Sequence, residues 1–404
     1  MSVRPALLCV TPVVPDTTGN GFAMRAGQVV QHLAAHYEVS LLAVAADGDA
    51  RVEVPDAIAR NCVHVHVETS QPPPSIDAIA DAVARLGGGA LLQNAHPAPF
   101  GDMPFDIVHA YRLAAVPRAL PYLLRAPRAF RMLDLDEVES ATCDRLAEVL
   151  ERDGDWRGPA LRTEARSLER IERAIVGQFD QVFVCSPREL AALPDEASRH
   201  HARVLPNTLP DVPVSPAAAQ RDIPFTFLFV GSLSSPANVD AVAYACREVV
   251  PLLRAAARRP FRVVVVGPGA SDDLVTLCRD ADVDLRGAVA DVVAAYDEAH
   301  VVIAPLRSGG GTRLKVIEAM RGRRPVVATS EAIAGIALTP EAHVLVGDTP
   351  ATFAAQCVRL MEAPSLAERI ARAAREVYVR DHRPAVMGRV ISAAAADFAA
   401  RPPR

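Results

Sequence analysis

Short runs of consecutive apolar residues alternate with longer amphipathic segments along most of this chain. In the first half, apolar runs of strand length lie at Ala6 to Val10, Val39 to Val44, Val63 to Val67, Ile107 to His109, Ala129 to Leu133 and Gln181 to Cys185. Segments with helical periodicity separate them, such as residues 25–36 and 163–177. Continuous apolar strands between amphipathic helices predict a parallel sheet that is covered on both faces.

The same alternation begins again in the second half of the chain. Apolar runs at Phe225 to Val230, Arg262 to Val266, Val283 to Leu285, Val301 to Ala304 and Pro325 to Ala328 predict a second parallel sheet. Residues 205–216, between the two series, are rich in proline and have no periodicity, which predicts a linker. The pattern therefore predicts an α/β protein with two Rossmann-like domains, residues 1–210 and residues 220–380.

Each of the first four predicted strands of the second series is followed by a turn that contains glycine. Gly231 and Ser232 follow the first strand, Gly267 the second, Gly287 the third, and Arg-Ser-Gly-Gly-Gly at residues 307–311 the fourth. Ligands of open parallel sheets bind outside the carboxyl ends of the strands, so these turns predict a binding edge. Neither half contains G-x-G-x-x-G or a P-loop, which argues against nicotinamide, flavin or P-loop nucleotide chemistry.

Lys315 is the only lysine of the chain, and the other 42 of its 43 basic residues are arginine. It follows the glycines of residues 309–311 and Arg313. Glycine N–H groups that open a helix form an anion site, to which arginine adds a fork of donors and lysine a point charge. We therefore expect Arg313 and Lys315 to bind phosphate. The alternative is that Lys315 is an ordinary residue on a helix surface.

Composition and charge narrow the class of protein. With 404 residues, half of them hydrophobic, the chain suits two domains. A net charge of −5 argues against a nucleic-acid partner. The seven cysteines have no C-x-x-C spacing and indicate reduced core residues. The first apolar run is too short for a signal peptide, and no run of 18 apolar residues could span a membrane, so we expect a cytoplasmic protein.

Four stretches of the chain resemble the GT-B glycosyltransferases, specifically the family-4 retaining group and its exopolysaccharide-type sugar transferase branch. These are residues 229–242, residues 287–306, residues 309–320 with 325–328, and, more loosely, residues 11–25. The resemblance implies a GT-B fold, with parallel sheets of two Rossmann-like domains facing across a cleft. It also implies a donor site on the C-terminal domain, an acceptor site on the N-terminal domain, and a last helix, residues 381–400, that packs back on the N-terminal domain.

The resemblance also implies which residues bind the nucleotide-sugar donor, with Glu318 accepting hydrogen bonds from the ribose. The expected donor-binding residues are Gly231, Ser232, Gly267, Val289, Gly309, Gly310, Gly311, Thr312 and Glu318, together with Gly19, Asn20 and Gly21 near the N-terminus. We predict that Glu318 lies on the first turn of its helix. Its alternative role is structural, as a negative charge placed favourably at the start of a helix. A plain loop is the alternative for residues 19–21.

Two departures from the family pattern concern the charge on the donor diphosphate. The family often has two glutamates eight positions apart, but the first position here is Gly310. It also often has an arginine directly after the first glycine of the C-terminal domain and a lysine a few residues on, where this chain has Ser232 and Ala237-Asn238. We expect Arg313 and Lys315 to replace this basic pair and to stabilise the leaving diphosphate as catalytic residues.

An acidic cluster, Asp-Leu-Asp-Glu-Val-Glu at residues 134–139, follows a predicted strand of the N-terminal half. In related enzymes a histidine near this place contacts the transferred sugar, and Asp134 stands here instead, so we expect Asp134 to bind sugar hydroxyls or orient the acceptor. We assign His109, Asp136 and Arg25 to acceptor binding. The alternatives are helix capping by Asp134 or Asp136, a structural His109 and a solvated Arg25. No metal site is expected, because Arg313 and Lys315 can supply the charge that a metal would.

These observations predict a retaining glycosyltransferase that moves a sugar from a nucleotide-diphospho-sugar to an acceptor hydroxyl. A UDP-sugar is favoured as co-substrate, and no cofactor is expected. The acceptor class stays open among a small molecule, a peptide and a lipid-linked molecule, since residues 117–131 mix leucines and aromatic residues with four arginines and could contact a membrane peripherally. Two other functions also stay open, a non-catalytic GT-B-shaped nucleotide-sugar-binding protein and a GT-B nucleotide-sugar epimerase.

Overall fold

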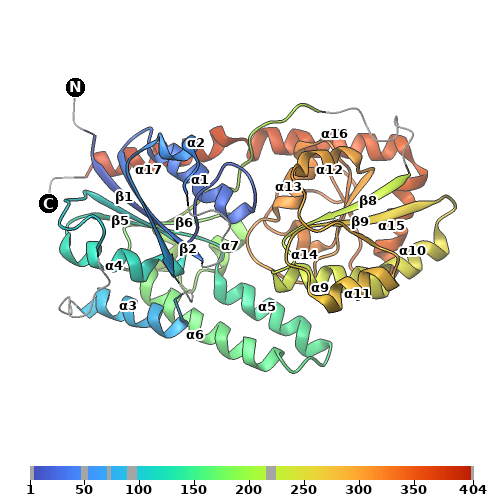
Figure 1. Ribbon diagram of the computed structural model, residues 1–404, viewed down its shortest axis with the longest axis horizontal. Coiled ribbons are helices and arrows are strands. Elements are labelled where there is room, and N and C mark those ends of the chain that lie inside the picture. Colours follow the sequence, from blue (N-terminus) through green and yellow to red (C-terminus); the bar gives the residue numbers. More distant parts are fainter. Residues whose placement is uncertain (1–3, 47–52, 71–73, 89–97, 215–223, 402–404) are drawn as a thin grey trace. The chain divides into compact units, whose positions relative to one another are not determined.

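The computed structural model describes residues 4–46, 53–70, 74–88, 98–214 and 224–401 (Figure 1). The chain forms two compact units. The first, the N-terminal unit, comprises Met1–Asp144, Pro159–Asn207 and Pro384–Arg404. The second, the C-terminal unit, comprises Arg145–Gly158 and Thr208–Arg383. The chain therefore returns to the N-terminal unit at its end.

The N-terminal unit is built on a parallel sheet with the strand order β3-β2-β1-β4-β5-β6-β7. Its strands are β1 (Ala6–Thr11), β2 (Glu38–Ala46), β3 (Cys62–Ser70), β4 (Ile107–Tyr111), β5 (Phe130–Asp136), β6 (Gln181–Val184) and β7 (Ala202–Val204). The order reverses between β1 and β4, so the crevice at the carboxyl ends of these two strands is the expected ligand site of such a sheet.

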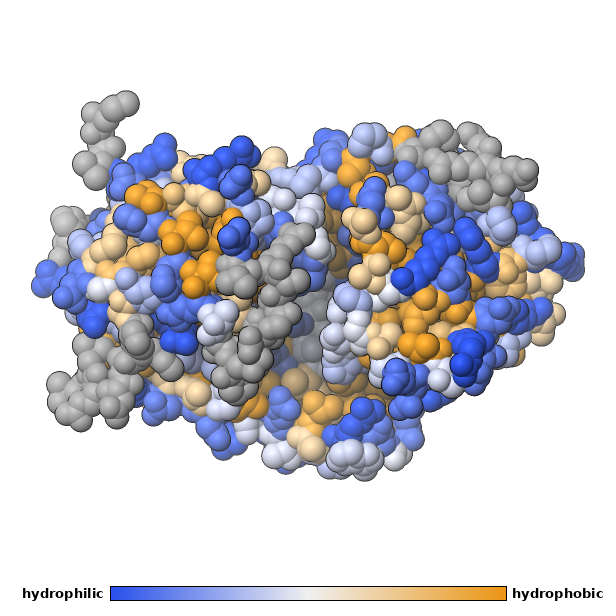
Figure 2. All heavy atoms as spheres, in the orientation of Figure 1, coloured by the Kyte–Doolittle hydropathy of each residue, from blue (hydrophilic) through white to orange (hydrophobic). Residues whose placement is uncertain are grey.

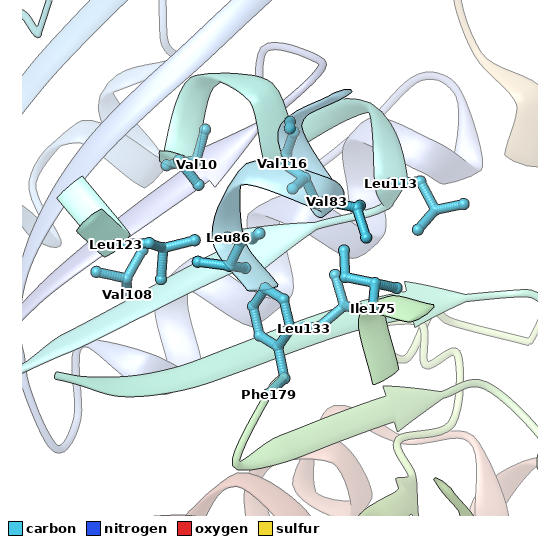
Figure 3. Close-up of a cluster of buried hydrophobic side chains, with 14 of the residues drawn as sticks. Val10, Val83, Leu86, Val108, Leu113, Val116, Leu123, Leu133, Ile175 and Phe179 are labelled. Atoms are coloured by element: carbon cyan, nitrogen blue, oxygen red, sulfur yellow. The ribbon is translucent and has the colours of Figure 1, made fainter. Parts of the chain in front are cut away.

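Side chains alternate between the two faces of the sheet along each strand. Both faces carry apolar side chains, and helices cover both. The helices are α1 (Gly21–Leu33), α2 (Asp56–Ala59), α3 (Ile76–Gly88), α4 (Val116–Arg125), α6 (Gly158–Val176), α7 (Pro187–Ala192), α8 (Glu196–His200) and α17 (Pro384–Ala399). Helix α5 (Glu139–Arg152) starts in this unit, and from Arg145 on it belongs to the C-terminal unit. Figure 3 shows one core, in which Val108 and Leu133 of the sheet pack against Leu86 of α3 and Leu123 of α4. The other core joins Leu7 and Met132 to α1 and α17.

The C-terminal unit has a second parallel sheet, with the order β10-β9-β8-β11-β12-β13. Its strands are β8 (Phe225–Val230), β9 (Phe261–Val266), β10 (Asp284–Leu285), β11 (Val301–Ala304), β12 (Val326–Ala328) and β13 (Leu345–Val346). Its helices are α9 (Pro236–Tyr244), the π-helical turn Ala245–Val249, α10 (Val250–Ala256), α11 (Asp272–Asp280), α12 (Val292–Glu298), α13 (Leu314–Arg321), α14 (Ser330–Ile333), α15 (Pro350–Glu362) and α16 (Pro364–Asp381). Here the order reverses between β8 and β11.

The two Rossmann-like sheets confirm the fold class predicted from the sequence. The short strands β7 and β13 were not predicted. Residues 205–214 of the predicted linker have no helix or strand, and the two units divide within them, between Asn207 and Thr208. The linker is packed at its start, where Leu205, Asn207, Thr208 and Leu209 are buried. Leu209 is held by α16, since Tyr378 Oη donates to its carbonyl oxygen at 2.9 Å. Residues 215 and 216 of that stretch lie outside the described residues.

Polar and apolar residues are interspersed on the face of the molecule shown in Figure 2. Among the helices that the structure describes, none combines the length and the apolar character needed to cross a membrane.

Candidate functional site

The candidate site lies at the carboxyl ends of β8 and β11 in the C-terminal unit. A Cβ atom on Gly267, after β9, would lie only 1.9 Å from the carbonyl oxygen of Gly231, after β8. The two turns therefore touch through their backbones, which is possible only with glycine at position 267. On the other side of β8 runs the segment after β11, residues 305–313, which we call the glycine loop.

Lys315 occupies the first turn of α13, directly after the glycine loop. Its side chain is buried, and Nζ donates to Asn238 Oδ1 on α9 at 2.6 Å. Nζ also lies 4.1 Å from the centre of the Phe229 ring at the end of β8, which is a cation–π distance. Burial and, secondly, the charge of Arg313 lower the pKa of Lys315 to about 7, against the opposing effect of Glu318. Lys315 is therefore not an ordinary surface residue.

Asn238 is the hydrogen-bond partner of the Lys315 ammonium, and the sequence did not mark it as a site residue. The family that the chain resembles often has a lysine at about this place, where this chain has Ala237-Asn238. The Asn238 side chain also donates to the Ser232 carbonyl at 2.8 Å and packs against Gly231. The ammonium of Lys315, on α13, therefore lies next to the position on α9 at which the family often has its lysine.

Arg313 folds back over the glycine loop. Its Nη1 donates to the carbonyl oxygens of Gly310 and Gly311, and its Nη2 lies 3.0 Å from Glu331 Oε1 on α14. A Cβ on Gly309, whose φ is 132°, would lie 3.2 Å from the Arg313 guanidinium. The sequence predicted a phosphate ligand at Arg313, and the structure shows a buried guanidinium already bonded to its own loop and to Glu331.

Glu318 lies one turn further into α13 than the sequence analysis predicted. The helix begins at Leu314, so Glu318 is its fifth residue and the helix-start alternative loses its basis. Tyr296 Oη, from α12, donates to Glu318 Oε2 at 2.7 Å. Burial raises the pKa of Glu318, and the hydrogen bond from Tyr296 opposes that rise. Tyr296 therefore fixes the carboxylate, a role that sequence reasoning missed because the two residues lie on different helices.

The other donor residues expected in the C-terminal unit, apart from Val289, lie in the turns that follow its strands. Thr312 is buried beside Arg313, and Ser232 accepts from Asn238. A hollow of about 860 Å³ runs along β9, β10 and α11, and Gly267 and Gly287 are among its lining residues. Val289 follows this hollow in the chain and is not among the residues that line it.

Replacing Glu318 with glutamine tests the ribose assignment. The substitution keeps the size and one acceptor oxygen, but it removes the charge and turns the other oxygen into a donor facing the Tyr296 hydroxyl. We expect UDP to bind roughly tenfold more weakly, the effect of weakening a hydrogen bond to a charged group. Calorimetry gives the dissociation constant and a melting curve the fold. An unchanged affinity with a large fall in Tm would show that Glu318 is structural.

In the N-terminal unit, Arg25 and Asp134 form a buried ion pair. Arg25 Nε and Nη2 lie 3.1 and 2.8 Å from the two carboxylate oxygens of Asp134. Arg25 Nη1 also donates to Leu205 O and Asn207 Oδ1. The solvated alternative for Arg25 is therefore wrong. Both side chains are inside the unit, so the structure gives neither an open position for a sugar or acceptor.

Asp134 and Asp136 do not cap α5, which was the alternative for them. The N–H groups at the start of that helix go to other carboxylates, since Val138 donates to Glu189 and Ser140 to Glu172. Asp136 instead lies beside Arg112, and both have positive φ, 61° and 64°. Such conformations in residues other than glycine cluster at functional sites.

Within the acidic cluster of residues 134–139, Asp136 is more exposed than Asp134, but Glu137 and Glu139 are more exposed still. Burial raises the pKa of Asp136, and Arg25 and Arg112 oppose that rise. Arg112 also pairs with Glu137 and Glu139, at 2.6 and 3.1 Å. In the described ranges, no three His, Cys, Asp or Glu side chains converge as a metal site. The missed residue here is Arg112, which no local sequence signal marked.

His109 and residues 19–21 complete the sequence candidates of this unit. His109 is buried in β4, where its Nδ1 lies 3.5 Å from Cys9 Sγ and burial lowers its pKa to about 3. This corrects its assignment to acceptor binding, because the ring is a neutral core group. Asn20 caps α1 by accepting from Ala23 N at 2.8 Å, and Gly19 before it has a φ of 96°. Gly19 and Asn20 are exposed, while Gly21 starts the helix.

One family model matches the part of the chain that contains the candidate site of the C-terminal unit. Residues 224–363 match the family model described as "Glycosyl transferases group 1". This stretch contains every element of the candidate site in the C-terminal unit. No curated protein matches the chain. The C-terminal unit thus carries the sequence pattern of group 1 glycosyl transferases.

Solved structures resemble the whole chain at low sequence identity. Sucrose-phosphate synthase from Thermosynechococcus elongatus has 18% identity and a TM-score of 0.72, covering 98% of this chain and 100% of that one. Anabaena Alr3699/HepE in complex with UDP and glucose has 14% identity and a TM-score of 0.65, covering 98% and 100%. A glycosyltransferase from Rickettsia africae has 12% identity and a TM-score of 0.65, covering all of both chains. These similarities show the GT-B fold.

Proposed function

We propose that the protein is a glycosyltransferase that moves a sugar from a nucleotide-diphospho-sugar to an acceptor hydroxyl, with retention of configuration. The observation that carries the proposal is the position of Lys315. The one lysine of the chain places its ammonium at the end of β8, beside Asn238, at the point where the strand order reverses. A UDP-sugar is favoured, since one structural neighbour is described with UDP and glucose.

Each residue of the site has a role in this reaction. Negative charge develops on the diphosphate as the bond to the sugar breaks, and the Lys315 ammonium, the Arg313 guanidinium and the N–H groups of the glycine loop stabilise it. Glu318, fixed by Tyr296, accepts hydrogen bonds from the ribose hydroxyls. The acceptor attacks on the face that the diphosphate leaves, and the diphosphate takes its proton, so no protein nucleophile is needed. Asp136 is the side chain of the N-terminal unit that we assign to the acceptor.

A panel of nucleotide sugars tests this function. We expect one of the UDP-, GDP-, dTDP- or ADP-sugars to raise the melting temperature, because a ligand at ~100 times its Kd stabilises the fold by about 2.7 kcal/mol. Acceptors are then screened with that donor, and NMR of the product identifies the anomer. Stabilisation without any turnover would favour a binding protein, and conversion of the donor without an acceptor would favour an epimerase.

Donor binding is expected to weaken as the pH rises. The pKa of Lys315 is lowered to about 7 by burial, so its charged fraction falls above that pH. A bound diphosphate favours the charged form, and binding therefore takes up a proton. We expect the affinity for UDP to fall by up to roughly tenfold per pH unit above about pH 7. Calorimetry in buffers of different ionisation enthalpy measures both quantities.

The matched variant for this pH dependence is Lys315→Arg, whose charge persists throughout that range. Its affinity for UDP should vary less with pH than that of the wild type. Equal pH profiles of the two proteins would show that another group titrates.

A further inference from the structure

Both terminal nitrogens of the Arg313 guanidinium are already bonded within the protein. A bidentate bond to phosphate needs two parallel N–H groups. Nη1 is bonded to the carbonyl oxygens of Gly310 and Gly311, and Nη2 to Glu331 Oε1 at 3.0 Å. The Arg313 side chain is only 6% exposed. A phosphate that binds through both terminal nitrogens must therefore replace one of these partners.

Glu331 is the partner that an anion would replace. The carbonyl oxygens of the glycine loop are neutral and belong to the same short segment as Arg313, whereas Glu331 is a carboxylate from a different element, α14. Its side chain is 21% exposed and is therefore closer to solvent than Arg313. Two anions beside one guanidinium repel each other, so the carboxylate and a diphosphate compete for Arg313.

The placement of Glu331 is built into the fold. Helix α14 follows β12, the neighbour of β11 in the sheet. Thr329 caps this helix by accepting from Ala332 N at 3.1 Å. Asp348 accepts from both the backbone and the hydroxyl of Ser330, each at 2.7 Å. These bonds fix the helix turn that carries Glu331 and so hold its carboxylate near the glycine loop.

We infer that Glu331 is an affinity-determining residue of the donor site, the internal carboxylate that neutralises Arg313 until a nucleotide diphosphate displaces it. This inference rests on the proposed function and concerns the same site. Displacement makes part of the binding free energy go into breaking the pair, so the protein binds the diphosphate more weakly than the loop alone would. The same competition releases the product, because Glu331 returns to Arg313 as the nucleoside diphosphate leaves.

Calorimetric titration of the full chain with UDP tests this inference. Glu331→Gln removes the competing charge and should lower the Kd for UDP roughly tenfold, within the range of coupling for groups in contact. A gain in affinity is a result that mere structural damage would not give. Glu341→Gln is the matched control, because it makes the same change at a carboxylate of the C-terminal unit that pairs with Arg359, and it should change the Kd less than about twofold.

A double-mutant cycle completes the test. In the Arg313→Ala background, Glu331→Gln should leave the Kd for UDP within about twofold, since the pair with Arg313 is gone and the contact of Glu331 with Arg145 Nε is longer, at 3.9 Å. Weaker or equal UDP binding by Glu331→Gln would overturn the inference and make Glu331 a residue that orients Arg313 for phosphate. A gain that persists without Arg313 would also overturn it. Failure of the wild type to bind any of UDP, GDP, dTDP or ADP would instead overturn the proposed function.

Discussion

Replacing Lys315 with methionine is expected to lower kcat/KM for sugar transfer by roughly 10²-fold or more, the effect of losing one group that stabilises a developing anion. Methionine keeps the apolar stem on the Phe229 ring and removes only the ammonium. The fold should persist, because burial disfavours the charge of Lys315, as its lowered pKa indicates. Steady-state kinetics with the donor identified in the panel, together with Tm, measure both effects. Arg313→Ala should cause a loss of similar size.

Arg321→Met is the control for the loss of a buried cation from the same helix. Arg321 is as buried as Lys315 but lies at the other end of α13, where it donates to the Pro210 carbonyl. Its substitution should leave kcat/KM within a few-fold of the wild type. Near wild-type transfer by Lys315→Met would show that the donor diphosphate is stabilised elsewhere.

Ending the chain at Arg383 is expected to unfold the N-terminal unit and abolish transfer. The deletion removes α17, which buries Met387 and Ile391 against the sheet and α1. It also removes the contact of Phe398 with Phe130, at 5.4 Å between ring centres. Each fully buried side chain contributes about 1.5–3 kcal/mol, and a domain is stable by only about 5–15 kcal/mol in total. Scanning calorimetry should show one transition lost.

Ending the chain at Arg401 is the matched control, since it leaves α17 intact and should keep all transitions. In the chain that ends at Arg383, the C-terminal unit should still bind UDP, at least weakly, because the donor residues assigned to this unit lie between Gly231 and Glu318. Retention of every transition in the chain that ends at Arg383 would contradict the assignment of α17 to the N-terminal unit.

The sequence predicted most strands because burial on both faces leaves a strong local signal. The run Val263–Val266, for example, can only be an interior strand or helix, and its length and the glycine after it decide for a strand. Strands β7 and β13 were missed because three and two residues are too short to show a period. The burial of the first residues of the predicted linker was also missed. Its prolines report the absence of regular structure, but they do not report burial.

The sequence predicted a candidate site in the C-terminal unit but not the state of its side chains. Glycines and a single lysine beside a strand end are local signals, and the structure places them together. Ion pairing is not local, since Arg25 meets Asp134 across 109 residues and Arg313 meets Glu331 across 18. An arginine on an amphipathic helix is usually solvated, and only its tertiary partner makes its burial favourable. For this reason the roles predicted for Arg25 and Asp134 did not fit their surroundings, and the role predicted for His109 did not fit its burial in β4.

A crystal structure of the full chain with UDP tests the central claim most directly. The account predicts the diphosphate at the carboxyl ends of β8 and β11, with an oxygen at about 2.8 Å from Lys315 Nζ, the length of a charge-assisted hydrogen bond. It also predicts the ribose hydroxyls on Glu318. A diphosphate bound away from the glycine loop, with Lys315 still bonded only to Asn238, would contradict it.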